Sequence, residues 1–274
     1  MPRLLNQHPG RYGALVLGAL PFLLIAAAYL VGSDLRLSAN PNDKLLPSVA
    51  TFADSIRQIA FEPDARSGDI LLWKDTASSL LRLLGGILIS AALALAAGIL
   101  LGVIPRVRAA FAPLVAVLSL IPPLAILPIL FIVFGLGEVS KVVLIVIGIT
   151  PFLIRDLALR TDEIPREQLI KAQTLGASTW LVILRVVLPQ ILPRLLDAVR
   201  LSLGAAWLFL IAAEAIAATD GLGYRIFLVR RYLAMDIILP YVAWITLLAF
   251  GCDLLLRRLS QRLFPWRHTE AGRT

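Results

Sequence analysis

The sequence contains few charged residues. Asp, Glu, Lys and Arg make up 16% of its 274 residues, whereas apolar and aromatic residues make up 59%. A soluble domain has about 25% charged residues, and a single core in a chain of this length could not bury so much apolar surface. The composition therefore excludes a disordered chain and favours a protein that is embedded in lipid.

Cysteine and histidine are also scarce. The one cysteine, Cys252, cannot form an internal disulfide bond, and one cysteine with two histidines disfavours a His/Cys metal centre, so we expect no bound metal. No His/Asp/Glu cluster, nucleophile elbow or metal motif stands in a loop, which makes a membrane enzyme the least favoured class. The net charge of +8 would suit nucleic acid as a partner. We expect no such partner, because the basic residues flank apolar runs as they do at membrane boundaries.

Six stretches are long and apolar enough to cross a bilayer, which takes roughly 20 mostly apolar residues as a helix. We expect an all-α integral membrane protein with a single transmembrane domain over residues 1–274. The first stretch is longer than the core of a signal peptide, which has about 7–15 residues, and no clear cleavage site follows it, so we interpret it as a retained helix. The expected spans are residues 13–32, 83–103, 111–134, 141–155, 201–218 and 237–256.

The distribution of lysine and arginine sets the expected orientation. With six spans both termini lie on one side of the membrane, and 16 of the 26 Lys and Arg residues fall in segments on that side. Because basic segments are retained in the cytoplasm, we expect both termini to be cytoplasmic. The long segment 34–75 then lies outside, and it carries seven acidic residues.

The second expected span carries a stripe of small residues four positions apart. They are Gly86, Ser90, Ala94, Gly98 and Gly102, and the last two form a GxxxG motif. In lipid, such a stripe lets two helix backbones approach closely. We expect it to be a packing face, either within the chain or against a second copy.

Two polar or helix-breaking features lie within the expected spans. Pro122, Pro123 and Pro128 fall in the third span, and each removes a backbone donor. They indicate either a kinked packing helix or a kink that lines a translocation pathway, because a broken helix is tolerated where it faces protein or a cavity. Glu214 is the only acid well inside an expected span. It is a candidate for the pathway or its outer gate, unless it reaches the nearby membrane interface.

The outer segment contains the signal of a short helix. Ser48 can cap a helix that runs to Ala60, in which Val49, Phe52 and Ile56 share one face. We expect this helix to lie on the outer membrane surface or on the bundle, with a solvated helix as the alternative.

The longest inner segment, about residues 162–193, exceeds what a simple turn between two spans needs. Glu167 and Lys171 are spaced as an i,i+4 pair, and Gly176 followed by Ser178 can end one helix and cap the next. We expect a short helix, a sharp turn and a second helix. The unit is either a docking element for a cytoplasmic partner or an inert amphipathic surface helix.

Residues 171–178, Lys-Ala-Gln-Thr-Leu-Gly-Ala-Ser, resemble the EAA loop in the permeases of binding-protein-dependent ABC importers. Other motifs stand in the order of that family, and Leu45-Leu-Pro-Ser48 is similar to its nitrate/sulfonate/taurine-type members. The further motifs are Val187-Leu-Pro189, Leu192-Pro193, Ser79-Leu-Leu-Arg82, Ile121-Pro-Pro123, Phe134-Gly-Leu-Gly-Glu138, Ala213-Glu214 and Gly221-Leu-Gly-Tyr224.

The resemblance implies a type I ABC importer permease in the cell inner membrane, which moves solute by alternating access. The implied partners are a second copy of the chain in a homodimer, two cytoplasmic ABC ATPase subunits and an extracytoplasmic solute-binding protein. The chain has no GxxxxGK[ST] phosphate loop, so we expect it to be no enzyme and to bind no cofactor itself, with ATP held by the ATPase. The implied solute is small and polar or ionic, such as a sulfonate, nitrate or a small nitrogen compound.

The resemblance also assigns ATPase coupling to the inner loop. The chain departs from the family pattern there, because Ile170 stands at the position of the family's glutamate and Lys171 at that of its first alanine. Glu167, one turn earlier, is the expected substitute. The implied coupling residues are Glu167, Lys171, Ala172, Leu175, Gly176, Ala177 and Ser178.

The alternative function is an ion-coupled secondary transporter or a channel. Such a protein needs several buried ionisable groups as a relay, and only Glu214 qualifies among the expected spans. The alternative also leaves the long inner loop without a role.

Overall fold

The computed structural model describes residues 10–41, 43–65 and 67–268, and within these ranges the chain is helical without a β-strand. This confirms the all-α fold class. Arg3, Arg66 and Arg273, which contribute to the expected orientation, lie outside the described residues. The helices are α1 Arg11–Ala39, α2 Val49–Phe61, α3 Leu71–Val103, α4 Pro105–Leu118, α5 Pro123–Phe134, α6 Glu138–Asp162, α7 Arg166–Thr174, α8 Thr179–Val182, α9 Leu188–Ala217, α10 Leu222–Arg230, α11 Met235–Leu263 and α12 Pro265–His268.

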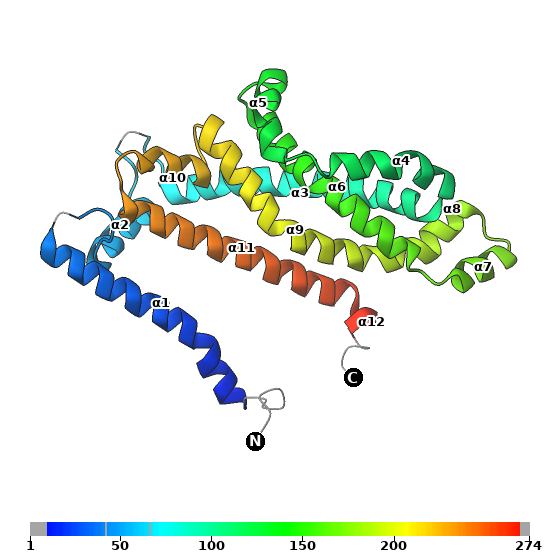
Figure 1. Cartoon of the computed structure of the whole chain (residues 1–274), viewed down its shortest axis with the longest axis horizontal. Coiled ribbons are helices and arrows are strands. Elements are labelled where there is room, and N and C mark those ends of the chain that lie inside the picture. The colour runs from blue at the N-terminus through cyan, green and yellow to red at the C-terminus, as the bar shows by residue number, and fades with distance from the viewer. Residues whose placement is uncertain (1–9, 42, 66, 269–274) are drawn as a thin grey trace.

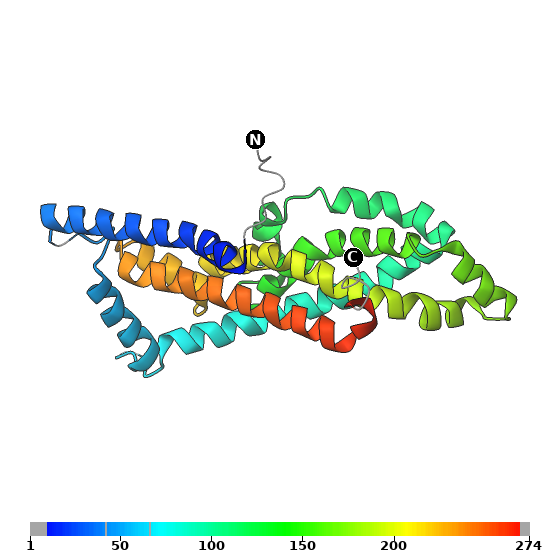
Figure 2. The same cartoon turned by 90° about the horizontal axis from the view of Figure 1, so that it is seen from below.

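Helices α3, α6 and α9 form the centre of an elongated bundle, with α11 along one side (Figures 1 and 2). Leu144, Leu153 and Leu157 of α6 are completely buried there, as is Leu210 of α9. α1 diverges from this bundle (Figure 1), and its apolar side chains are exposed. Apolar surface left outside such a core is what a lipid-embedded helix presents.

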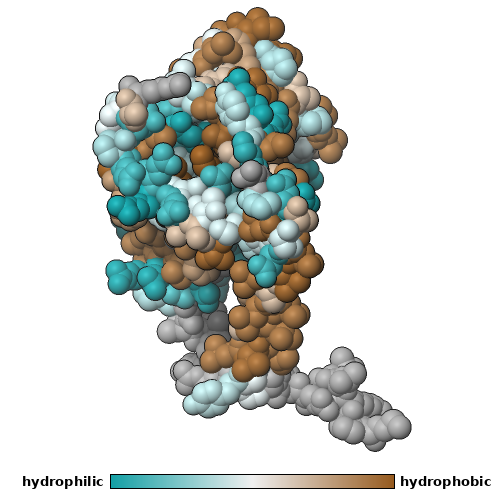
Figure 3. All heavy atoms as spheres, turned by 90° about the vertical axis from the view of Figure 1, so that its left-hand side faces the viewer, coloured by the Kyte–Doolittle hydropathy of each residue, from teal (hydrophilic) through white to brown (hydrophobic). Residues whose placement is uncertain are grey.

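The bundle has two distinct ends. α2 and α10 lie at one end, called here the α10 end, whereas α7 and α8 lie at the opposite end, called the α7 end (Figure 1). Hydrophilic side chains gather on the α10 end, with hydrophobic residues around them (Figure 3).

The expected cap of α2 is confirmed, because the Ser48 hydroxyl accepts a hydrogen bond of 3.1 Å from the Thr51 backbone N–H.

The small-residue stripe of α3 packs against α6 within the chain. A Cβ atom at Gly86 would lie 2.7 Å from Ile145 Cγ2, and one at Gly98 would lie 2.6 Å from Leu157 Cβ. At Gly102 the corresponding distance to Thr161 Cβ is 2.2 Å. Only glycine permits such an approach, so the stripe sets the separation of the two helices.

The third expected span, residues 111–134, is two helices rather than one. α4 and α5 meet at a bend of 93°, and the break covers residues 119–122. Pro122 and Pro123 provide no backbone N–H to continue the α4 ladder, and the residue before a proline avoids the helical conformation. Within the residues that the structure describes, five helices are long and apolar enough to cross a membrane, or six if the α4–α5 pair counts as one.

Several helices extend beyond their expected spans. α3 begins at Leu71 rather than residue 83, and α6 covers Glu138–Asp162 rather than residues 141–155. The second helix of the inner loop continues into the fifth span, because α8, a π-helical segment at Ile183–Val187 and α9 form one helical run over Thr179–Ala217. The π-helical segment directly precedes Leu188–Pro189. Pro189 has no N–H to donate to the carbonyl four residues earlier, as an ordinary helix requires.

Candidate functional site

The turn between α7 and α8 is a compact helix-ending motif. Gly176 has φ +82°, and its N–H donates to Gln173 O at 2.9 Å, while the Ala177 N–H donates to Ala172 O at 3.0 Å. This pair of hydrogen bonds is the Schellman motif, in which the residue after the helix adopts the left-handed conformation that favours glycine. The Ser178 hydroxyl then caps α8 by accepting from the Leu181 N–H at 3.3 Å.

The motif projects apolar side chains outward at the α7 end. Leu175 is 88% exposed and Trp180 is 65% exposed, whereas Ala172 and Ala177 are half-buried and pack against the core. Exposed large apolar side chains next to a fixed turn are typical of a contact surface. We call Leu175, Trp180 and the turn between them the coupling tip. Trp180 was not among the expected site residues, because exposure of an aromatic residue is not visible in the sequence.

The charged residues of α7 are exposed and unpaired with each other. No ion pair between Glu167 and Lys171 forms in the part of the chain that the structure describes, although their spacing permits one. Ile170, at the position of the family's glutamate, is also exposed. α7 therefore presents one acidic group, the two basic groups of Arg166 and Lys171, and the apolar Ile170 to a partner.

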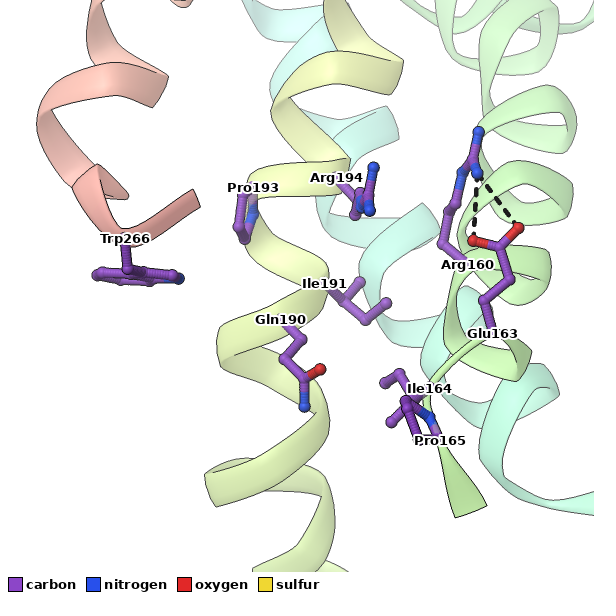
Figure 4. A pocket seen from close by; sticks show the side chains of 9 residues that line it. All are labelled: Arg160, Glu163, Ile164, Pro165, Gln190, Ile191, Pro193, Arg194 and Trp266. Atoms are coloured by element: carbon purple, nitrogen blue, oxygen red, sulfur yellow. Dashed lines mark hydrogen bonds and ion pairs between the residues drawn. The ribbon is translucent and has the colours of Figure 1, made fainter. Parts of the chain in front are cut away.

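A polar contact joins α7 to the membrane helix α9. Gln190 Nε2 of α9 donates to Gln168 Oε1 of α7 at 3.0 Å. Beside this contact lies a pocket of about 360 Å³, in which Ile164 and Pro165 face Gln190 and Ile191, with Trp266 of α12 on the other side of α9 in the view of Figure 4. α7 and α9 are therefore in direct contact.

A second polar site lies inside the α10 end. Glu214 of α9 is completely buried. Its carboxylate accepts hydrogen bonds from the Ser79 hydroxyl at 2.8 Å, from Arg82 Nη1 at 2.8 Å and from the Gly223 N–H at 2.9 Å. Glu214 thus does not reach the membrane interface. A role for Glu214 in the pathway or its outer gate stays a prediction. Glu214 would act there by fixing the position of α10.

Arg82 and Asp75 extend this site to five helices. Arg82 also donates to Glu138 of α6 at 2.8 Å and to the Asp220 carboxylate at 2.5 Å. Asp75 accepts from the Gly221 N–H at 3.0 Å, from Arg225 at 2.8 Å and from the Tyr241 hydroxyl of α11 at 2.9 Å. We call this set the polar latch. It joins α3, α6, α9, α10 and α11.

The polar latch corrects one expectation from the sequence. Glu214 is not the only buried ionisable group, because Asp75, Arg82 and Lys141 are buried as well. Asp75 and Arg82 lay outside the expected spans because α3 begins twelve residues before the apolar run that marked its span, whereas Lys141 stood at the edge of the expected span 141–155, which α6 extends. Burial disfavours the charge of Arg225 in the latch, but the hydrogen bond and charge of Asp75 outweigh this and raise the pKa of Arg225. Each carboxylate of the polar latch accepts hydrogen bonds from donors within the site. The polar latch is therefore a satisfied hydrogen-bond network rather than a relay of free ionisable groups.

Two glycines beside the polar latch lie so close to neighbouring atoms that neither position has room for a side chain. Gly221 has φ +115°, and a Cβ atom there would lie 2.6 Å from Glu214 Cδ. A Cβ atom at Gly223 would lie 2.6 Å from Ile211 O. The glycine turn therefore lets three consecutive N–H groups, at residues 221–223, reach Asp75, Ser79 and Glu214.

A third polar contact lies at the helix break at residues 119–122. Pro122 is the exposed last residue of the break and directly precedes α5, and Pro128 lies within α5. Facing the break, Arg155 of α6 donates to the Ser119 hydroxyl at 2.8 Å. Among the described residues no group of three His, Cys, Asp or Glu side chains is placed to hold a metal ion.

Comparisons with known proteins agree on one family. Residues 79–265 match the family described as the binding-protein-dependent transport system inner membrane component. The taurine transport system permease protein TauC of Escherichia coli (strain K12) is 37% identical over 198 residues, which cover 72% of each chain. The putative aliphatic sulfonates transport permease protein SsuC of Bacillus subtilis (strain 168) is 30% identical, over 97% of this chain and 94% of that protein.

A more distant relative and a solved structure extend this result. The nitrate import permease protein NrtB of Leptolyngbya laminosa is 28% identical over 71% of this chain and 70% of its own length. The fold matches a chain of the MetNI methionine ABC transporter in an inward-facing conformation, with a TM-score of 0.58 and 21% identity, over 70% of this chain and 93% of that chain. This likeness supports the type I importer permease fold.

Proposed function

Because the chain belongs to the family of inner membrane components of binding-protein-dependent transport systems, it is a permease subunit of an ABC importer, and we propose that it moves a small polar or ionic solute into the cell by alternating access. The relatives at 28–37% identity are permeases for taurine, aliphatic sulfonates and nitrate. Their solutes support a sulfonate, nitrate or a small nitrogen compound for this chain.

The coupling tip is the observation that carries the proposal of a separate ATPase. A fixed turn with two exposed apolar side chains, beside unpaired Glu167 and Lys171, is suited to a groove on a partner subunit. The sequence has no phosphate loop of its own. ATP therefore binds to the partner, and this chain holds no cofactor and catalyses no reaction.

The proposed assembly contains two copies of this chain, two cytoplasmic ATPase subunits and an extracytoplasmic solute-binding protein. In the inner membrane the α7 end and both termini face the cytoplasm, which the excess of Lys and Arg in those segments supports. The hydrophilic α10 end then faces the solute-binding protein (Figure 3).

The contacts within the chain support alternating access. Closure of the ATPase pair on ATP displaces α7, and the contact between Gln168 and Gln190 passes this displacement to α9. α9 carries Glu214 at its other end, where the polar latch holds α10. One continuous helical run, Thr179–Ala217, therefore connects the two ends.

Copurification and uptake test the proposal against an ion-coupled transporter. Tagged permease is isolated from the membranes of its own cells, and the partners are identified by mass spectrometry. We expect an ABC ATPase, and we expect uptake by membrane vesicles that contain the complex to require ATP and to resist a protonophore. Uptake that is abolished by the protonophore and indifferent to ATP would establish the ion-coupled alternative instead.

A further inference from the structure

Arg155 is an exposed cation on a membrane helix. It lies on the face of α6 that carries Phe152 and Leu159, opposite the buried Leu153 and Leu157. Among the described residues its guanidinium makes one hydrogen bond, in which Nη1 donates to the Ser119 hydroxyl at 2.8 Å. A guanidinium has five N–H donors, so most of the donors of Arg155 have no partner among the described residues.

Arg155 has no acidic partner within the described part of the chain. In contrast, Arg160 of the same helix pairs with Glu163 at 3.2 Å, and Arg200 of α9 pairs with Asp253 at 2.9 Å. An unpaired charge within a membrane-spanning segment is costly and marks a functional site by default.

The direction of the Arg155 side chain excludes a simple membrane anchor. The ion pair between Arg108 and Asp162, at 3.0 Å, places the start of α4 and the end of α6 at one level. Counted from that level at 1.5 Å per residue, Arg155 stands about 10 Å along α6 and Ser119 about 16 Å along α4. An anchoring arginine would turn back toward the nearer interface, whereas Arg155 reaches deeper, toward the helix break.

The surroundings of Arg155 suit a small anion with an apolar body. A cavity of about 320 Å³ lies between α3, α4 and α6, and its wall includes Ala112, Ala116 and Ala158. Arg108 and Arg155 are the charged residues of the wall, with no carboxylate among the described lining residues. Arg108 is already bound to Asp162, so Arg155 carries the charge that is open to a ligand.

We propose that Arg155 and Ser119 form an anion-recognition site on the translocation pathway, which binds the oxyanion group of a small solute such as a sulfonate. The inference rests on the proposed function and names the solute class of the same permease. The Ser119 hydroxyl donates to Ala116 O at 2.7 Å and accepts from Arg155, so it orients the guanidinium. The free N–H groups then pair with two oxygens of the anion, a geometry that guanidinium favours.

A thiol-reactivity experiment tests this site with Arg155 in place. The chain has one cysteine, so Ala112→Cys in a Cys252→Ser background creates one thiol in the cavity. Its reaction rate is measured in liposome-reconstituted complex with two methanethiosulfonate probes of similar size, the anionic sulfonatoethyl reagent and the cationic trimethylammonioethyl reagent. We expect the anionic reagent to react faster relative to the cationic one, and Arg155→Gln to reduce this rate ratio about tenfold. Arg155→Lys, which keeps the charge without the planar fork, is expected to fall between.

The outcomes separate this site from its alternatives. No reaction with either reagent shows a site closed to water and overturns the proposal, as does a rate ratio that Arg155→Gln leaves unchanged. Phosphate headgroups share the oxyanion chemistry, so the ratio is measured with and without phosphatidylglycerol in phosphatidylcholine liposomes. Loss of the anionic preference on addition of phosphatidylglycerol would assign Arg155 to lipid. The readout needs no ATP hydrolysis. Copurification of the ATPase without a preference for the anionic reagent would therefore overturn this inference and leave the proposed function intact.

Discussion

Arg82 of α3 donates a hydrogen bond of 2.8 Å to Glu214 of α9, and both side chains are buried although 132 positions separate them in the sequence. The same guanidinium binds Glu138 and Asp220. Three acids on one arginine hold the start of α6, the end of α9 and the turn before α10 together.

Removal of either partner of this pair is expected to destabilise the permease. Breaking a buried ion pair by removing one partner costs about 3–5 kcal/mol. Glu214→Gln and Arg82→Gln should therefore each lower the thermal midpoint of the detergent-solubilised protein, and Glu214→Gln should also reduce solute uptake by the complex that still assembles. In the double variant we expect the two costs to be less than additive, with a coupling energy of about 0.5–3 kcal/mol. Strict additivity would show that the two side chains do not act as a pair, and full uptake by Glu214→Gln would remove the role in transport.

The glycine turn beside the latch allows a matched comparison of two glycines. Gly221 has φ +115° and its Cβ position is occupied by Glu214, whereas Gly137 has φ −76° and open space around it. Gly221→Ala is expected to cost about 1–3 kcal/mol, because the left-handed conformation is strained for a side chain. Gly137→Ala is expected to cost only about 0.5 kcal/mol, because Gly137 is the N-cap of α6 and alanine is a poorer N-cap than glycine. Equal thermal midpoints for the two variants would contradict the close approach at residue 221.

The approach of α3 to α6 can be tested in the same way within one helix. A Cβ atom at Gly98 would overlap Leu157, whereas one at Gly85 meets nothing within 4 Å. We expect Gly98→Ala to destabilise by about 1–3 kcal/mol through overpacking. Gly85→Ala should be neutral or slightly stabilising, since alanine favours the helix. The thermal midpoints of both variants are measured in detergent. Indistinguishable midpoints would show that the small-residue stripe does not set the separation of α3 and α6.

The sequence predicts the parts of this structure that depend on local spacing. Glycine spacing predicts the packing face of α3, and Gly176 followed by Ser178 predicts the turn between α7 and α8, because both signals lie within one helix or one turn. The extension of α3 to Leu71 is not predicted, since Asp75 and Arg82 are typical loop residues by hydropathy. Their partners, Arg225 and Glu214, lie 150 and 132 positions away, and only the fold brings them together.

The break between α4 and α5 shows where prediction from sequence ends. Pro122 and Pro123 indicate that a helix cannot continue, but the bend of 93° depends on how α4 and α5 pack on neighbouring helices. The pairing of Arg155 with Ser119 follows from the same packing. No spacing rule connects residues that are 36 positions apart in two helices.

Gly176 is expected to be required for the coupling tip. Its φ of +82° is accessible to glycine, whereas a bulky L side chain in this conformation costs about 1–2 kcal/mol. No side chain lies within 4 Å of its Cβ position, so Gly176→Val adds backbone strain without a clash. That strain is small compared with the stability of the whole bundle but large enough to shift a turn held by two backbone hydrogen bonds.

For Gly176→Val we expect normal membrane insertion, weaker capture of the ATPase and loss of solute-stimulated ATP hydrolysis. Gly204→Val, in a helix with open space at its Cβ position, is the control that should leave all three measurements unchanged. Undiminished ATPase capture and normal stimulated hydrolysis by Gly176→Val, at equal amounts of permease, would reject the turn as the coupling element.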